Sequence, residues 1–488
     1  MDQVGSALLA FPPPQKALAD NKAYHQAAML HVQRLAKLVR ERSKDLVQYS
    51  TELFNVVDPA VNSLSYLNIL YALLFPSVAT RVPQSLILEK LVTFLMVFDG
   101  RQCRYGGSFL SEILVAVGNG RLLPPSVAVE CLASAILKID PSGTMLTSSH
   151  LLLAKLAYDT NHIEPALPVI QGTIVYYPGM ANHNSAELLC DLALPPPLYI
   201  SHTTGLTTTL KSSSVLEYGL MCGMMYCGRR EWSKARVAFE RLVTYPSKDG
   251  GVSKIMIEGF RKWILVSLLS EGKHSDTPSH TSAATSKLFT TLGRAYISLA
   301  TAFASDDVEQ LRATAGAEAQ TWTEDGNVGL VSEVIASYQK WRILSLQHIY
   351  TKISISEIRQ QTKSAATGNA LATDEDVEAL IQNMIIAGML KGVIEKNDDG
   401  TKFLVFLSPT MHVPEIEFAI EIGFEVRRLE QLKAIFIATN QRLGTSKEYI
   451  KWVVKENKRD KTGEAQDPTL GFDAQIDDED LMGGVSKS

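Results

Sequence analysis

Residues 373–407 read TDEDVEALIQNMIIAGMLKGVIEKNDDGTKFLVFL, and the pattern within this stretch decides the fold. Thr373 opens a capping signal that runs to Asp376, a spacing at which two side chains satisfy free amides in the first turn of a helix. Apolar residues then recur at helical spacing on one predicted face: Val377, Leu380, Ile381, Met384, Ile385 and Gly388. The spacing predicts a helix from Thr373 to Leu390.

A β-hairpin is predicted directly after this helix. Val393-Ile394 and residues 403–407 are short apolar runs typical of strands. Between them lies Asn397-Asp398-Asp399-Gly400, whose residue types tolerate the positive φ of a tight turn. The predicted order is therefore helix, strand, turn, strand.

Two further helices are predicted upstream. The first spans about 328–348, with apolar residues at helical spacing. The second is short, ends near Thr362, and begins at a capping box formed by Ser354 and Glu357. Three helices followed by a hairpin are the order of a winged helix, so the sequence predicts a small α+β module of that kind.

From about residue 15 to 307 the chain reads as one helix after another. The clearest segments are 23–56, 60–75, 85–98, 107–117 and 125–139, and alternating strand patterns are scarce. The predicted fold class is therefore all-α, carrying the winged-helix module near its C-terminal end.

Some of these helices pair in a way that is typical of tetratricopeptide (TPR) repeats. The positions that match this pattern are Gly223, Tyr226, Trp232, Ala235, Phe239 and Pro246. The two small residues allow close approach of two helices, and the aromatic residues fill the space between them. Residues 153–170 repeat the pattern more weakly. An ordinary helical hairpin is the alternative, and we favour a stack of TPR-like repeats because several such pairs follow in series.

A last long helix is predicted over 414–443. Its apolar residues recur largely at heptad spacing and form a predicted protein interface: Phe418, Ile422, Leu429, Leu432, Phe436 and Leu443. The alternative is that this stripe packs on the chain's own winged helix. Beyond Lys455 the chain is polar, and residues 473–480 carry five acids, which predicts a disordered acidic tail.

These patterns predict five regions. They are an N-terminal helical region (1–145), TPR-like repeats (146–327), the winged-helix module (328–410), a C-terminal bundle helix (411–454) and the acidic tail (455–488). Within the repeats, the Ser/Thr-rich stretch 203–214 and the stretch 274–285 are predicted to be surface loops.

The composition excludes several classes of protein. The net charge of −5 gives no broad basic surface for a polyanion, and five cysteines without C-x-x-C spacing favour reduced thiols in the cytoplasm or nucleus. The most apolar run, residues 67–75, ends at Pro76 and is too short to cross a membrane. No secretory leader is predicted at the N-terminus.

Helical repeats that lead into a winged helix and a long helix resemble the PCI-domain family. Residues 252–269, 327–331 and 165–168 are similar to segments of one signalosome subunit of this family, and the resemblance covers about 145–440. Members scaffold the proteasome lid, the COP9 signalosome and a translation initiation factor complex. The resemblance implies a PCI domain, other PCI-domain and MPN-domain subunits as partners, and a part in removing Nedd8 from cullins, with catalysis in a different subunit.

The sequence offers no catalytic, cofactor or metal site of its own. No two of the ten histidines are two residues apart, no H-E-x-x-H occurs, and phosphate-loop and G-x-S-x-G motifs are missing. Cys222 and Cys227 are interpreted as core thiols rather than nucleophiles. We therefore expect neither an enzyme nor a small-molecule-binding protein.

Nucleic-acid binding is the functional alternative for a winged helix. The predicted recognition helix contains Asp374, Glu375, Asp376 and Glu378 and no Lys or Arg, and the predicted turn adds Asp398 and Asp399. Phosphate binding needs cationic side chains. The first hypothesis is a scaffold subunit of the COP9 signalosome, the second a proteasome-lid subunit, and the third a nucleic-acid-binding PCI protein of the mRNA-export type.

Overall fold

The computed structural model describes residues 2–13, 20–76, 82–178, 188–246, 251–274, 277–278, 280–397, 400–407, 415–445 and 449–455. The chain forms two compact units, residues 1–414 and 415–488. The first unit is all-α with one small sheet, and the second is helical where the structure describes it. This confirms the predicted fold class.

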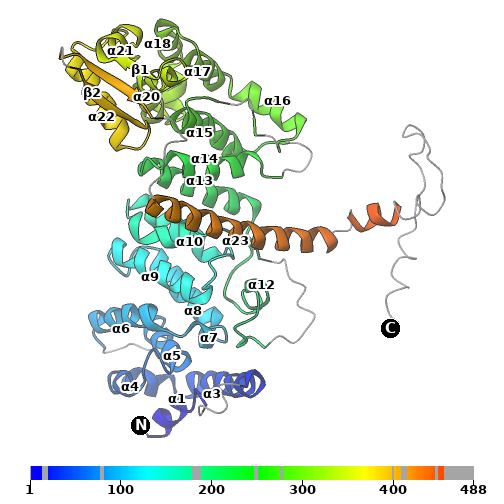
Figure 1. Cartoon of the computed structure of the whole chain (residues 1–488). Helices are drawn as coiled ribbons and strands as arrows, with labels where there is room; N and C mark the ends of the chain where they lie inside the picture. Colours follow the sequence, from blue (N-terminus) through cyan, green and yellow to red (C-terminus); the bar gives the residue numbers. More distant parts are fainter. Residues whose placement is uncertain are drawn as a thin grey trace. The chain divides into compact units, whose positions relative to one another are not determined.

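The N-terminal half of the first unit is built from successive helices that follow one another along the stack (Figure 1). They are α1 (Asp2–Leu8), α3 (Asn21–Gln48), α4 (Ser50–Val56), α5 (Ser63–Leu74), α6 (Gln84–Val97), α7 (Gly100–Cys103), α8 (Gly107–Gly118), α9 (Pro125–Ile139), α10 (Ser148–Asp159) and α11 (Leu167–Ile170). The helix predicted over 23–56 is interrupted twice: Arg42 leaves helical geometry at a kink within α3, and Tyr49 does so between α3 and α4.

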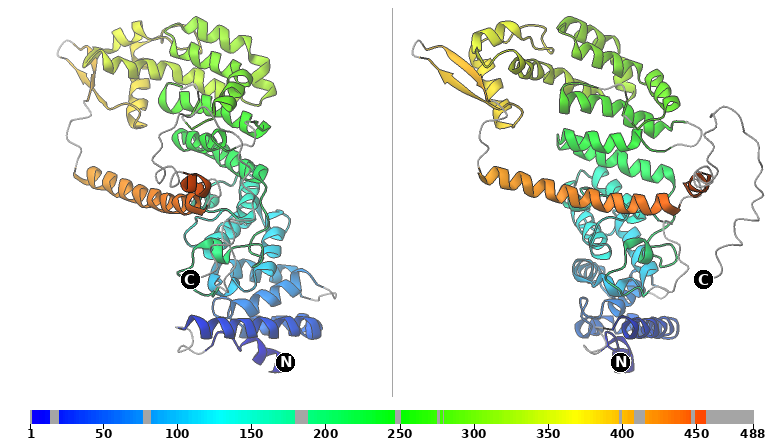
Figure 2. Two further views of the ribbon diagram at one scale, coloured as in Figure 1. Left: turned by 90° about the vertical axis from the view of Figure 1, so that its right-hand side faces the viewer. Right: turned by 45° about the vertical axis from the view of Figure 1, so that its right-hand side comes forward.

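The C-terminal half of this unit continues the stack. Its helices are α12 (Pro196–Tyr199), α13 (Ser212–Gly228), α14 (Trp232–Val243), α15 (Lys254–Glu271), α16 (Ala283–Leu292), α17 (Arg294–Ala304), α18 (Val308–Ala317), α19 (Ala319–Glu324) and α20 (Val328–Ser345). Helix α10 contacts α13, α13 contacts α14, and α14 contacts α15, so successive helices cover one another, as Figure 2 shows from two sides.

The two predicted loops are shorter than expected. Residues 212–214 already belong to α13, and residues 283–285 form the first turn of α16. Ser282 caps α16 by accepting a hydrogen bond from the amide of Thr285, which is buried. A helix start that is rich in Ser and Thr has the sequence pattern of a loop, because these residues favour both helix caps and turns.

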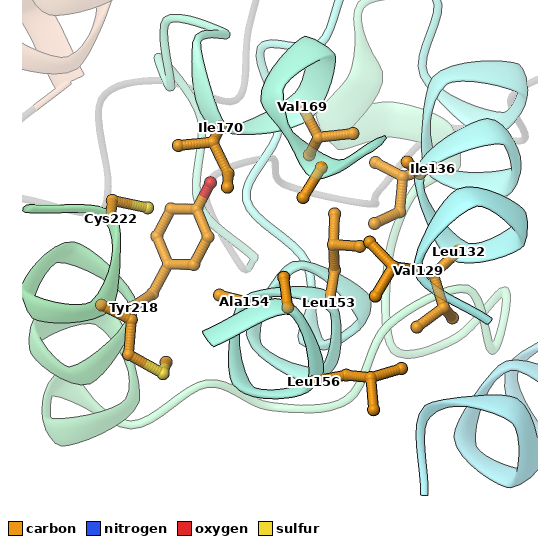
Figure 3. Close-up of a cluster of buried hydrophobic side chains, with 14 of the residues drawn as sticks. Val129, Leu132, Ile136, Leu153, Ala154, Leu156, Val169, Ile170, Tyr218 and Cys222 are labelled. Carbon is orange, nitrogen blue, oxygen red and sulfur yellow. The ribbon is translucent and has the colours of Figure 1, made fainter. Parts of the chain in front are cut away.

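One continuous apolar core runs through the helical stack. It extends from Val4 in α1 to Ala365, beyond α20. Figure 3 shows a part of it, where Leu132 and Ile136 of α9 lie against Leu153 of α10 and Val169 of α11. Each helix therefore contributes to the same core, as a stack of helical repeats requires.

The pair α13 and α14 packs as the sequence predicts. A Cβ atom placed on Gly223 would lie 2.3 Å from Cε1 of Phe239, so the two helices touch at a distance that only glycine allows. Ala235 and Phe239 are both fully buried, and the Tyr226 hydroxyl donates to the carbonyl oxygen of Ile170 over 3.3 Å. The small residues thus set the helix spacing.

The winged-helix module has its own core and a three-stranded antiparallel sheet. Its elements after α20 are β1 (Lys352–Ser354), α21 (Ile355–Gln361), α22 (Asp374–Ile386), β2 (Gly392–Lys396) and β3 (Lys402–Phe406), with sheet order β1-β3-β2. Leu404 of β3 is fully buried between Ile353 and Ile394, its partners in the register. The hairpin prediction is confirmed, although residues 398 and 399 of its turn lie outside the described residues.

Three details of this module differ from the prediction. Strand β1 was not predicted. Glu357 does not complete a capping box: its amide donates to Ser354 Oγ, but its carboxylate accepts from Gln361, because Ser354 is paired with β3. Helix α22 ends at Ile386 rather than Leu390, since Gly388 has a φ of +70° and is exposed instead of extending the apolar face.

Residues 189–191, which lie between α11 and α13 in the sequence, contact the N-terminal helices through Arg101 of α7 and Arg104, the residue that directly follows α7. The Arg101 guanidinium donates to the carbonyl oxygen of Cys190 over 2.7 Å. Arg104 is buried and donates to the carbonyl oxygens of Leu189 and Asp191 over 2.9 Å each. These contacts join parts of the chain that are more than 80 residues apart.

Two histidines are buried in a neutral form. His31 lies 2.9 Å from Ser65 Oγ, and burial lowers its pKa to about 4. His150 Nδ1 accepts from the amide of Thr147 at the start of α10, and burial lowers its pKa to about 4 as well. The ordinary pKa of histidine is 6.5. Below pH 6.5 these two histidines therefore bind protons in the unfolded chain but not in the folded chain. The free energy of unfolding decreases as the pH falls.

We expect the chain to lose roughly 2 kcal/mol per buried histidine between pH 8 and pH 5. Replacing both, as His31→Gln with His150→Gln, should flatten this pH dependence even if it lowers stability at pH 8. The matched control is His280→Gln with His348→Gln, two exposed positions that should leave the slope unchanged. Urea unfolding at both pH values measures the slope, and a wild-type chain equally stable at pH 5 and pH 8 would contradict the expectation.

A buried polar network joins α15 to the start of α20. The Lys262 ammonium, 2% exposed, donates to Asn327 Oδ1 over 2.7 Å and pairs with Glu258. Asn327 donates to the Tyr296 hydroxyl, which donates to the Asp325 carboxylate over 2.8 Å. Two of the segments that carry the family resemblance, 252–269 and 327–331, therefore meet here through hydrogen bonds.

Asn327→Leu should destabilise the chain by about 2–4 kcal/mol, because it leaves a buried ammonium and a buried hydroxyl each short of a partner. Adding Lys262→Met should restore part of this loss, since it removes the uncompensated charge. Urea midpoints of the single and double variants give the comparison. A double variant that is less stable than Asn327→Leu alone would show that the network does not carry the predicted coupling.

Candidate assembly surface

The second unit contains the helix α23 (Glu415–Thr445), which matches the helix predicted over 414–443. Residues 449–455 are also helical. The acidic segment 473–480 lies outside the described residues. Helix α23 is long enough to carry four heptads, and its apolar residues decide what it can bind.

The six predicted interface residues lie exposed on α23. Their side chains are between 48% and 69% exposed: Phe418, Ile422, Leu429, Leu432, Phe436 and Leu443. We call these six residues the heptad stripe. Whether another protein covers the stripe stays a prediction, but its exposure in the chain leaves a continuous apolar face of the kind that marks interaction sites.

A second apolar face on the first half of α23 was missed in the sequence. Ile416, Ile420 and Phe424 follow one another at i, i+4 and i+8, and each is more than half exposed. They precede or follow Phe418 and Ile422 by two residues, which places them about 200° away around a helix. The signal was present as apolar residues at every second position from 416 to 426.

The two apolar faces divide α23 into two parts that differ in how many of their sides other protein must cover. From residue 416 to 426 apolar side chains point to opposite sides, so this part needs covering on both. From Leu429 onward most exposed large apolar residues lie on the heptad stripe, with Ile437 beside it, and Glu430 and Gln441 occupy the other side. A single partner helix can cover the second part, whereas the first part fits the interior of a bundle.

The winged helix presents a mixed surface rather than a uniformly acidic one. Asp374 pairs with Arg359 over 2.9 Å, and Glu378 pairs with Lys402 over 2.5 Å. Two of the four acids on α22 are thus neutralised by neighbouring cations. Helix α22 itself carries no Lys or Arg between 374 and 386, so it still lacks the side chains that bind phosphates.

We expect duplex DNA or RNA to bind this chain only weakly at physiological salt. The reason is the missing cations on α22, since phosphate contacts supply most non-specific affinity. Fluorescence anisotropy with a labelled duplex at several salt concentrations measures it. A sub-micromolar affinity with a steep salt dependence, removed by substitutions within 373–402, would contradict this expectation.

The described residues hold no group of three or more His, Cys, Asp or Glu side chains that could bind a metal ion. Burial raises the pKa of both the Cys222 and the Cys227 thiols to about 12, which keeps them protonated at neutral pH. Across the same part of the chain, no helix combines the length and the apolar character that a membrane crossing requires.

Comparison with known proteins extends the resemblance to the N-terminal helices. The family model for the N-terminal helical repeats of COP9 signalosome complex subunit 3 matches residues 30–285, and so includes helices before residue 145, where the resemblance described above began. The COP9 signalosome complex subunit 3 of Neurospora crassa is 40% identical over 498 residues, covering 99% of both chains. That of Emericella nidulans is 28% identical over 445 residues, covering 88% of both. On this similarity along its whole length, the chain belongs to the family of COP9 signalosome complex subunit 3.

Proposed function

We propose that this chain is a non-catalytic scaffold subunit of a COP9 signalosome, where it supports removal of Nedd8 from cullins by another subunit. The relatives support membership of the complex through their names. The observation that carries the scaffold role is α23, whose apolar residues are exposed along its length. A helix with apolar residues on two sides is stable in water only when other protein covers it.

The proposed mechanism is burial of α23 among helices of other PCI-domain and MPN-domain subunits. Burying one large apolar side chain contributes roughly 1.5–3 kcal/mol, so the heptad stripe alone offers enough to hold a subunit in a complex. The second face, Ile416, Ile420 and Phe424, requires contact on the opposite side. The first half of α23 would then bind at least two neighbours, which fits a scaffold that joins subunits.

The non-catalytic part of the proposal rests on the chemistry of the described side chains. The thiols of Cys222 and Cys227 are protonated, and the buried histidines are held by structural hydrogen bonds rather than directed into a cleft. Free, reduced cysteines also suit the cytoplasm and nucleus, which we propose as the location.

The test is purification of a tagged chain from cells, followed by mass spectrometry. We expect the full set of signalosome subunits to co-purify and the complex to cleave a Nedd8–cullin conjugate. The chain produced alone should not cleave it and should contain no stoichiometric zinc. Recovery of proteasome-lid subunits instead would overturn the assignment, and conjugate cleavage by the isolated chain that is lost on chelation would overturn the non-catalytic role.

A further inference from the structure

Helix α3 presents a basic face at the N-terminal end of the helical stack. It contacts α1, α4 and α5, and buries Tyr24, Ala28, His31 and Leu35 (Figure 1). The exposed side carries three cations at i, i+3 and i+6, which lie on one side of a helix, and a fourth exposed cation just after a kink at Arg42: Arg34, Lys37, Arg40 and then Lys44. We call these four residues the basic face of α3.

The basic face of α3 is not neutralised by the chain. None of its four side chains forms an ion pair with another residue in the part of the chain that the structure describes. Glu41 is the one carboxylate exposed among them. The chain as a whole is acidic, with a net charge of −5, so this concentration of positive charge runs against its composition.

Two structural explanations for these cations fall short. Positive side chains stabilise a helix through its dipole only in the last turn; this accounts for Arg40, which lies in the turn before the kink at Arg42, but not for Arg34, and the final turn of α3 holds no cation. The outermost helix of a stack needs a polar outer side for solubility, but a surface serving that need mixes both signs of charge. Four cations facing one carboxylate leave an attractive potential that a ligand can use.

The face also has an apolar end. Met29 and Leu30 lie one turn before Arg34 on the exposed side of α3, and both are more than 40% exposed. A nucleic-acid backbone would gain nothing from these two residues and would be repelled by Glu41. An acidic segment of polypeptide with an apolar residue beside its carboxylates complements both halves of the face.

We propose that the basic face of α3 is a docking site for an acidic segment of a partner protein. Coulombic attraction to the four cations orients the segment along α3, and an apolar side chain at one end covers Met29 and Leu30. This goes beyond the proposed scaffold role of α23, because it places a second contact at the other end of the sequence. It predicts a contact that depends strongly on salt, unlike an apolar helix bundle.

The first test uses the complex purified through the tagged chain. A carbodiimide joins a carboxylate directly to a lysine amine, so it reports contacts made by Lys37 and Lys44. We expect cross-links from these lysines to Asp or Glu of another subunit, and their loss when about 0.5 M NaCl is added first. Reaction of other surface lysines without Lys37 or Lys44 would overturn the proposal, as would links only to residues 464–480 of this same chain.

The second test uses the isolated chain, so its result does not depend on membership of the complex. The probe is a labelled peptide with the sequence of residues 464–480, which contains seven carboxylates and no Lys or Arg. Arg34→Gln with Lys37→Gln and Arg40→Gln should weaken binding about tenfold, since each exposed charge pair contributes modestly. Glutamine keeps the helix propensity of the residues that it replaces.

The matched control removes three exposed cations elsewhere, as Lys287→Gln with Arg294→Gln and Lys363→Gln. It should change the peptide affinity by less than about twofold. A chain ending at Lys455 should bind the peptide as the full chain does. Equal affinity of the α3 triple variant and the wild type would overturn the proposal, and so would binding about tenfold tighter by the shortened chain, since its own tail would then be the occupant.

Discussion

A chain carrying Leu429→Asp and Phe436→Asp should be missing from the purified signalosome while its helical repeats stay folded. Each substitution places a carboxylate on the heptad stripe, where the wild-type side chains are 63% and 69% exposed. In the free chain the new charges meet water and cost little. In a helical bundle each would be buried without a partner, at a cost of several kcal/mol.

The control for this result is Glu430→Lys with Gln441→Asp, two exposed positions on the side of α23 away from the stripe and beyond the second apolar face. This control should enter the complex at the wild-type level. The paired measurements are recovery in the complex and thermal unfolding of the isolated variant. Loss of the cooperative transition would show that the stripe belongs to the chain's own core. Normal recovery of the stripe variant would show that the stripe is not an assembly surface.

Phe239→Ala should destabilise the helical stack by about 4 kcal/mol, which is near the upper end for a single core substitution. The ring is fully buried between α13 and α14, and the stack around it is continuous, so the cavity has little room to collapse. Loss of this contact should lower the urea midpoint and increase hydrogen exchange in α13, α14 and α15.

Gly223, which faces Phe239, gives a second test, because the stability change caused by Gly223→Ala should reverse its sign when Phe239 is replaced. Gly223→Ala alone should destabilise, because its Cβ would lie 2.3 Å from the Phe239 ring. In the Phe239→Ala background the clash is gone, and the better helix propensity of alanine, worth about 1 kcal/mol, should make Gly223→Ala stabilising. A double-mutant cycle in urea measures the coupling. If Gly223→Ala changes stability in the same direction in both backgrounds, the contact between α13 and α14 does not require glycine at this position.

The winged helix shows which structural features the local sequence could predict and which it could not. The capping box of Thr373 and Asp376 is present as predicted, because its two hydrogen bonds join residues three apart. Strand β1 was missed because it has only three residues, and their pairing with β3 lies about 50 residues further along the chain. The end of α22 was misplaced because Leu390 is buried and apolar, although it follows the left-handed turn at Gly388.

Helix α23 shows the opposite case, in which the pattern was visible but ambiguous. Residues 416–426 carry a large apolar side chain at every second position, as a strand would, while the heptad that begins at Ile422 continues to Leu443. Helical geometry through Thr445 turns that alternation into two apolar faces. The sequence held the residues of both faces, and the helix decided where each one points.

The sequence by itself determined the helical stack, the winged helix and the long final helix, because periodicity, capping and small-residue spacing act over a few residues. Only the tertiary structure decided that Arg104 holds the carbonyl oxygens of Leu189 and Asp191, and that Lys262 is buried against Asn327. Those partners are 65 to 87 residues apart, and any residue offers a carbonyl oxygen. A contact whose acceptor is the backbone, or whose partner is chosen by packing, leaves no pattern along the chain.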